Sequence, residues 1–198
     1  MKKIIFALSV LLLASGTIFA QEAEEVKASA GINQRVGIMF NYEPSVGAIA
    51  DYISCNAGGG ISYELGIPFA GEMEFGFSGN AYFDYNPVKD DLLSYVWNTK
   101  FFAGAFIRIP IGGGFAFQPE FDYGITMYFP KANPKYDNQL DSTYTDQLLQ
   151  LGLGFRYSSQ SFAKDKIEIA VAPTYTYSKE QEYSTHYIGF KAGILLKL

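Results

Sequence analysis

Apolar side chains alternate with small or polar side chains along most of this chain. Over residues 28–42 the even positions are mostly apolar, whereas the odd positions carry mainly small or polar residues. A period of two residues is typical of a β-strand with two unlike faces, and the 3.6-residue period of an amphipathic helix is almost absent. The alternation recurs over eight stretches, at residues 28–42, 53–65, 73–85, 95–108, 115–129, 147–157, 167–177 and 187–198.

Polar, glycine-rich or proline-rich segments separate these stretches. Residues 43–47 follow the first, a Pro68–Gly71 turn ends the second, and Pro110–Gly114 forms another tight turn. Residues 130–143 make the longest polar connection. Eight two-faced strands predict an all-β fold, a closed eight-stranded antiparallel up-and-down barrel with both chain ends on the same side.

Composition excludes several other classes of protein. The chain is 48% hydrophobic and 17% aromatic, which is too apolar for disorder, and a net charge of −5 is wrong for a nucleic-acid binder. The single cysteine, Cys55, excludes an intramolecular disulfide and a cysteine-based metal site. We expect no cofactor, no metal and no catalytic residues.

The first twenty residues have the layout of a secretory signal peptide. Lys2 and Lys3 precede an apolar run over 4–14, and small residues lead to Ala20. An apolar run of about eleven residues is too short to span a bilayer, which needs about 20. We therefore predict a signal peptide over 1–20 and a single barrel domain over 21–198.

The two faces of the strands differ in a way that predicts which one is outside. The polar face is dominated by small residues, which suit a crowded lumen, while the apolar face is bulky and suits lipid. The alternative is a soluble periplasmic barrel whose apolar face lines a ligand cavity. Aromatic residues near the strand ends resemble membrane-interface girdles. One predicted girdle contains Tyr42, Tyr85, Tyr95, Trp97, Phe129, Tyr175 and Tyr177, and the other contains Tyr63, Phe75, Phe115 and Tyr157.

Charged residues on the polar face are predicted to lie in the lumen. These are Arg35, Glu64, Glu74, Asp84, Lys100, Arg108, Glu120, Asp122, Arg156, Glu168 and Lys191. Ordered by depth, a central charge cluster of Arg35, Lys100, Glu120, Asp122 and Lys191 is expected. We interpret this cluster as an ion-pair plug, and the alternative is a narrow gate. The acids of residues 137–146 are predicted to lie in a solvated loop.

In architecture the chain resembles the small eight-stranded outer-membrane barrels of the OmpA, OmpX and OmpW type. The resemblance covers nearly all of residues 21–198, and the last strand keeps its alternation, although Leu198 stands where such barrels end in an aromatic residue. It implies a cell outer-membrane location with periplasmic termini and external loops. It also implies contact with outer-membrane lipid, assembly through the last strand by the barrel-assembly machinery, and a structural or surface-interaction role with an extracellular ligand at the loops.

Particular residues suggest two other functions. An OmpW-like narrow path for small, hydrophobic solutes is suggested by three aromatic residues on the lumen side, Phe102, Phe106 and Tyr128. Ser184 and His186 share a face and offer a serine–histidine pair. Barrels similar to lipid A deacylase carry their serine two positions after the histidine, where this chain has Ile188. We expect His186 to be an interfacial residue.

Overall fold

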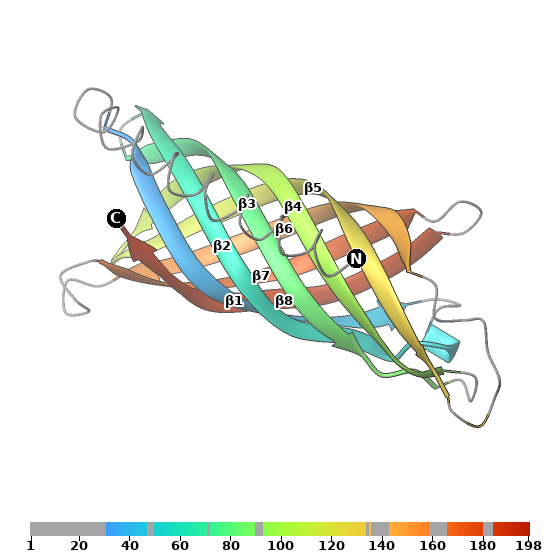
Figure 1. The fold of residues 1–198 in the computed structure, drawn as a ribbon. Helices are drawn as coiled ribbons and strands as arrows, with labels where there is room; N and C mark the ends of the chain where they lie inside the picture. The colour runs from blue at the N-terminus through green and yellow to red at the C-terminus, as the bar shows by residue number, and fades with distance from the viewer. Residues whose placement is uncertain are drawn as a thin grey trace.

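A computed structural model describes residues 31–46, 50–70, 72–89, 93–133, 135, 143–158, 166–179 and 184–198. Their eight strands close into one barrel in chain order, with β8 pairing to β1 (Figure 1). The predicted signal peptide lies outside the described residues. The strands are β1 (Asn33–Val46), β2 (Cys55–Ala70), β3 (Met73–Asn86), β4 (Leu93–Gly112), β5 (Phe115–Ala132), β6 (Tyr144–Ser158), β7 (Ile167–Lys179) and β8 (Ser184–Lys197).

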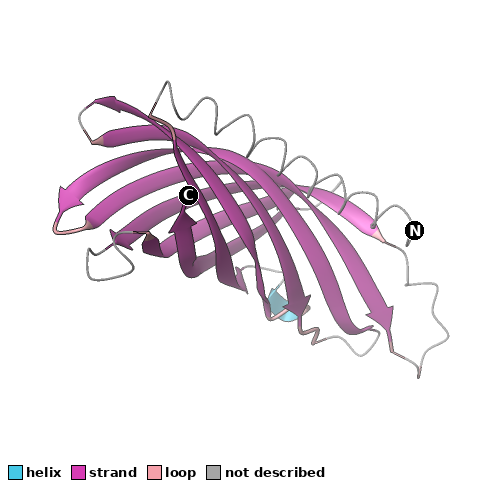
Figure 2. Ribbon diagram, turned by 60° about the vertical axis from the view of Figure 1, so that its left-hand side comes forward, coloured by secondary structure: helices cyan, strands magenta, loops and turns pink. Residues whose placement is uncertain are grey.

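Every neighbouring pair of strands is antiparallel, and the closing pair is as regular as the others. Phe40 of β1, for instance, is paired with Gly59 of β2 on one side and with Ala192 of β8 on the other. Figure 2 shows a barrel built almost wholly of strands, with one short helical turn at residues 50–51. In the part of the chain that the structure describes, no helix has the length and apolar character to cross a membrane.

The alternation in the sequence becomes two unlike surfaces. Along β3, exposed and buried side chains alternate almost without interruption. The outer wall is apolar, with Ile38 61% and Phe40 62% exposed, whereas Asp84 and Asn98 in the lumen are 0% exposed. The apolar face therefore points outward and the polar face inward, as the sequence predicts.

Three strands run on into the turns predicted to end them. β1 continues through the predicted turn at 43–47 as far as Val46, because Glu43 turns into the lumen and finds hydrogen-bond donors there. β2 runs through Pro68, and a register shift between Pro68 and Ala70 accommodates the proline. β4 runs through Pro110 in the same way, which leaves Gly113 and Gly114 alone at the turn, with φ of 62° and 82°.

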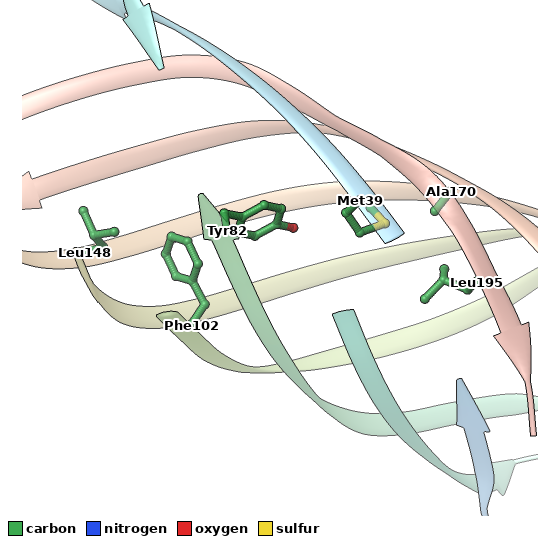
Figure 3. Packing of buried hydrophobic residues seen from close by; sticks show 6 residues of the cluster. All are labelled: Met39, Tyr82, Phe102, Leu148, Ala170 and Leu195. Atoms are coloured by element: carbon green, nitrogen blue, oxygen red, sulfur yellow. The ribbon is translucent and has the colours of Figure 1, made fainter. Parts of the chain in front are cut away.

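A small apolar group lies among the polar side chains of the lumen. Figure 3 shows Leu148 and Phe102 toward one end of this group, with Tyr82 beside them; the Tyr82 and Phe102 ring centroids are 6.3 Å apart. The group comes from six of the eight strands and consists of Met39, Tyr82, Phe102, Leu148, Ala170 and Leu195. Apolar as well as polar side chains thus occupy the lumen, and a cavity of about 320 Å³ remains at the end lined by Arg35, Arg108 and Arg156.

Candidate functional site

The lumen is lined by charged residues that are almost fully buried. Below, the terminus end is the end where β1 begins and β8 ends, and the far end is the opposite one. Five bases and eight acids are buried in the described part of the chain. They are Arg35, Lys100, Arg108, Arg156 and Lys191, with Glu43, Glu64, Glu74, Asp84, Glu120, Asp122, Asp146 and Glu168.

Three arginines, each paired with a glutamate, form the arginine cluster at the terminus end. Arg35 binds Glu74 through two hydrogen bonds of 2.8 Å. Arg108 binds both carboxylate oxygens of Glu168, one of them at 2.8 Å. These are fork-to-fork pairs, the strongest geometry available to a guanidinium and a carboxylate. The cluster is completed by Arg156 and Glu64, whose closest N–O distance is 2.6 Å.

Further contacts join these pairs into one network across the lumen. The Gln118 side chain accepts a hydrogen bond from Arg108 at 3.0 Å and donates one to Glu64 at 3.1 Å. Glu168 also lies 3.7 Å from Arg35 and 3.9 Å from Arg156. Because its members come from β1 to β7, the network ties together strands on opposite sides of the barrel.

A single lysine holds two acids near the middle of the barrel, and we call this group the central lysine site. The Lys191 ammonium lies 2.5 Å from Glu120 and 3.4 Å from Asp122. Ser78 donates a hydrogen bond of 3.0 Å to the other oxygen of Asp122. Glu120 is 3.8 Å from Arg156, which links this site to the arginine cluster.

A second lysine forms the far lysine site with Glu43 and Asp84. The Lys100 ammonium contacts both carboxylates, and its distance to Asp84 is 2.9 Å. Glu43 also accepts hydrogen bonds from Thr176 at 2.7 Å and from Gln150 at 3.0 Å. A buried carboxylate that is both paired and hydrogen-bonded meets the usual condition for keeping a charge out of water.

The structure distributes the five residues of the predicted central cluster over these three sites. Glu120, Asp122 and Lys191 meet in the central lysine site, whereas Arg35 belongs to the arginine cluster and Lys100 to the far lysine site. Arg35 lies nearer the terminus end than predicted because β1 begins at Asn33 and not at residue 28. Its neighbour on β8 is accordingly Lys197, close to the end of the chain.

Two buried acids were missed by the sequence reasoning. Glu43 was assigned to a turn and Asp146 to a solvated loop, yet both lie in strands with their side chains in the lumen. A signal was available for Glu43, which continues the odd-numbered polar face of the first strand after Asn41. Asp146 likewise continues the even-numbered face of β6.

Aromatic residues gather on the outer wall near both ends of the strands. Toward the far end, Trp97 stacks on Phe83 with ring centroids 4.8 Å apart and meets Tyr85 at 5.0 Å. Phe129 lies opposite Trp97 in the register of β4 and β5. The predicted girdle members Tyr42, Tyr95, Tyr175 and Tyr177 make ring contacts at the same level. Toward the terminus end, Phe115 and Tyr157 are 4.5 Å apart.

His186 belongs to this aromatic surface. Its Nδ1 is hydrogen-bonded to the hydroxyl of Tyr175 at 2.6 Å, and its ring also contacts Tyr177. The Nδ1 atom of His186 is thus engaged by a phenol of the neighbouring strand β7. Among the residues with described positions, no group of three or more His, Cys, Asp or Glu side chains is arranged to hold a metal ion.

Comparison with known proteins gives likeness in structure only. Neither family models nor curated protein sequences match the chain. Among solved structures, Neisserial surface protein A is similar at a TM-score of 0.54 and 11% identity, over 85% of this chain and 98% of that one. The fold is that of small outer-membrane barrels. A major outer membrane protein of Thermus thermophilus is similar at a TM-score of 0.51 and 10% identity, over 84% and 99%. The predicted closed eight-stranded barrel is confirmed.

Proposed function

We propose that this chain is an integral outer-membrane barrel without enzymatic activity, with a structural or surface-interaction role and a lumen closed by its own side chains. The observation that carries the proposal is the inverted polarity of the fold. Large apolar side chains such as Ile61 and Ile188 are 62% and 60% exposed. Charged residues such as Lys100 and Glu168 are 2% exposed.

This distribution of polarity argues against the soluble-barrel alternative. A soluble barrel covers its outside with charged residues and keeps its apolar face for a cavity. Here apolar surface faces outward on every strand, which would be costly in water at about 25 cal/mol per Å². Lipid removes that cost, and closure of the sheet leaves no edge whose backbone groups would lack partners in the membrane.

The distance between the two aromatic girdles matches a bilayer. Phe115 and Phe129, one at each girdle, both lie on β5. At ~3.3 Å per residue the strand between them is about 46 Å long, and a tilt of about 45° reduces this to about 33 Å along the barrel axis. The hydrocarbon core of a bilayer is about 30 Å thick.

The lengths of the connections support periplasmic termini. At the terminus end, β2 and β3 as well as β4 and β5 are joined by two residues each, and β6 and β7 are joined by eight. The far end holds the connections over 47–54, 87–92, 133–143 and 180–183, which are longer on average. Outer-membrane barrels have short periplasmic turns and longer external loops. In this orientation the far loops offer the surface for an extracellular ligand, and the assembly machinery reads β8.

Ion pairs across the lumen support a closed interior. Each buried base has at least one acid within 2.9 Å of its charged nitrogen atoms. Phe102, Phe106 and Tyr128, the residues that suggested a hydrophobic path, are all 5% exposed or less within the packed lumen. The central lysine site and the arginine cluster together cross the lumen, so a solute would have to break several buried pairs to pass.

Membrane fractionation combined with gel migration tests the proposal. The protein is expected in the outer-membrane fraction after washing with urea, and it should migrate differently before and after boiling because the closed barrel resists detergent. Recovery of the protein in the soluble periplasmic fraction would overturn the proposal that it is an integral membrane barrel. Digestion of intact cells with protease addresses orientation separately, since cleavage is expected in the far connections.

A further inference from the structure

The outer wall of the barrel contains a groove with a volume of about 350 Å³. Its lining is apolar and comes from four consecutive strands, β3 to β6. The side chains that shape it are Phe75, Ala105, Ile107, Pro119, Phe121 and Leu151. The groove therefore lies on the face that the proposed function places in lipid, and the inference below rests on that function.

Differences in side-chain size explain the hollow. Ala105 lies opposite Phe121 in the register of β4 and β5, and Pro119 lies two residues before Phe121 on β5. Ala105 and Pro119 are thus diagonal neighbours on the outer wall, and the outward-facing side chains around them are larger. Phe121 and Leu151, which are paired across β5 and β6, stand beside them at 50% and 53% exposure.

The groove also follows a break in the pairing of β4 with β5. Paired residues run up to Phe106 with Glu120 and resume at Ile109 with Phe117, so that Pro119 lies inside the gap. A proline has no amide hydrogen to donate across the sheet. Phe106 and Glu120 line the groove although their side chains are buried in the lumen, which shows that the hollow reaches down to this seam.

A second proline loosens the wall next to the groove. The pairing of β6 with β7 is broken between Gly152 with Thr174 and Phe155 with Val171, and Pro173 lies in that gap. Leu153 of β6 is thus flanked by Pro119 on one side and by Pro173 on the other. Fewer hydrogen bonds fix the sheet here, so this part of the wall is able to adapt its shape to a bound chain.

We propose that the groove binds one acyl chain of a phospholipid in the leaflet nearest the terminus end. The side chains that line it from the outer wall are all hydrocarbon, and Ile107 and Pro119 lie on the terminus side of the wall, a few residues from the Phe115 girdle. With the termini in the periplasm, this is the phospholipid leaflet. A chain seated in the hollow gains contact on its sides as well as its underside.

Native mass spectrometry of the detergent-purified barrel with added phosphatidylethanolamine tests the proposal. Ala105→Phe fills the groove, and Ala105→Leu does so with a smaller side chain in case the phenyl ring hinders folding. Ala192→Phe is the matched control, because Ala192 is an outward alanine on β8 away from the groove. Heat-modifiable migration checks that each variant is folded.

The wild type and Ala192→Phe are expected to retain one phospholipid with the same affinity, and folded Ala105 variants to bind it about tenfold more weakly. Equal retention by the Ala105 variants, no retention by the wild type, or retention of lipopolysaccharide in place of phospholipid would each overturn the proposal. If only the proposal for the groove is wrong, the protein is still found in the membrane fraction. A failure of the proposed function instead places the protein in the soluble fraction.

Discussion

Glu43 shows how much one side chain contributes to closing this lumen. Its carboxylate forms an ion pair with the Lys100 ammonium and accepts hydrogen bonds from Thr176 and Gln150. It is 1% exposed, so no water replaces these contacts when they are lost. Such a residue stabilises the barrel mainly because its partners would be costly to leave buried without it.

Glu43→Gln should therefore lower the stability of the barrel by about 2 kcal/mol, since Asp84 still neutralises part of the Lys100 charge. The measurement is the urea midpoint for unfolding in detergent micelles. Glu72→Gln, at an exposed position outside the strands, is the control and should leave the midpoint unchanged. Equal midpoints for the wild type and Glu43→Gln would contradict the role assigned to the far lysine site.

The central lysine site predicts a larger effect. Lys191→Met leaves Glu120 and Asp122 facing each other without their shared cation, and the expected loss is about 3–5 kcal/mol. The conversion temperature in heat-modifiable gel migration should fall further than in Glu43→Gln. Lys166→Met removes an exposed lysine and serves as the matched control. A Lys191→Met barrel as heat-resistant as the wild type would refute the pairing.

Sequence alone located the lumen residues but not their partners. Alternation identifies Arg35, Lys100 and Lys191 as inward-facing, because a period of two decides the face of a strand. Partners depend on how far each strand slides past its neighbour, and that stagger is set by closure of the whole sheet. Arg35 was accordingly placed at mid-depth, although it pairs with Glu74 near the terminus end.

At the scale of strands, the interiors were predictable and several ends were not. Long alternating runs such as β3 leave little choice of conformation. Proline and glycine were interpreted as stops, yet β2 and β4 continue through Pro68 and Pro110. Both prolines stand at register shifts, where a missing amide hydrogen costs little, and a local pattern does not reveal where a bulge will form.

The turn between β4 and β5 gives a prediction at this scale. Gly114 has a φ of +82°, and a Cβ there would collide with the backbone carbonyl oxygen of Ser158. Gly114→Ala should destabilise the barrel by about 2–3 kcal/mol. Gly113→Ala shares the positive φ, but its Cβ would make only an ordinary van der Waals contact with the Phe115 ring at 3.8 Å, so a loss of only about 1 kcal/mol is expected. Equal urea midpoints for the two variants would contradict this account.

For the molecule as a whole, the pairs across the lumen predict a barrel that does not conduct. Planar-bilayer recording of the wild type should show no steady current, because the arginine cluster and the central lysine site block the interior. The matched comparison is Glu120→Ala, which removes one partner of Lys191. A steady wild-type conductance that is lost or altered in Glu120→Ala would favour the narrow gate over the plug.

The buried charges are sorted along the barrel axis. All three buried arginines lie in the cluster at the terminus end, where Glu64, Glu74 and Glu168 balance them. Near the middle, Lys191 accompanies Glu120 and Asp122, and toward the far end Lys100 accompanies three acids, Glu43, Asp84 and Asp146. The excess of buried acids over bases therefore makes the electrostatic potential of the lumen more negative toward the far end than at the terminus end. Any thermal opening that lets ions in from the far side would admit sodium or potassium ahead of chloride, so a leak through this barrel would be cation-selective.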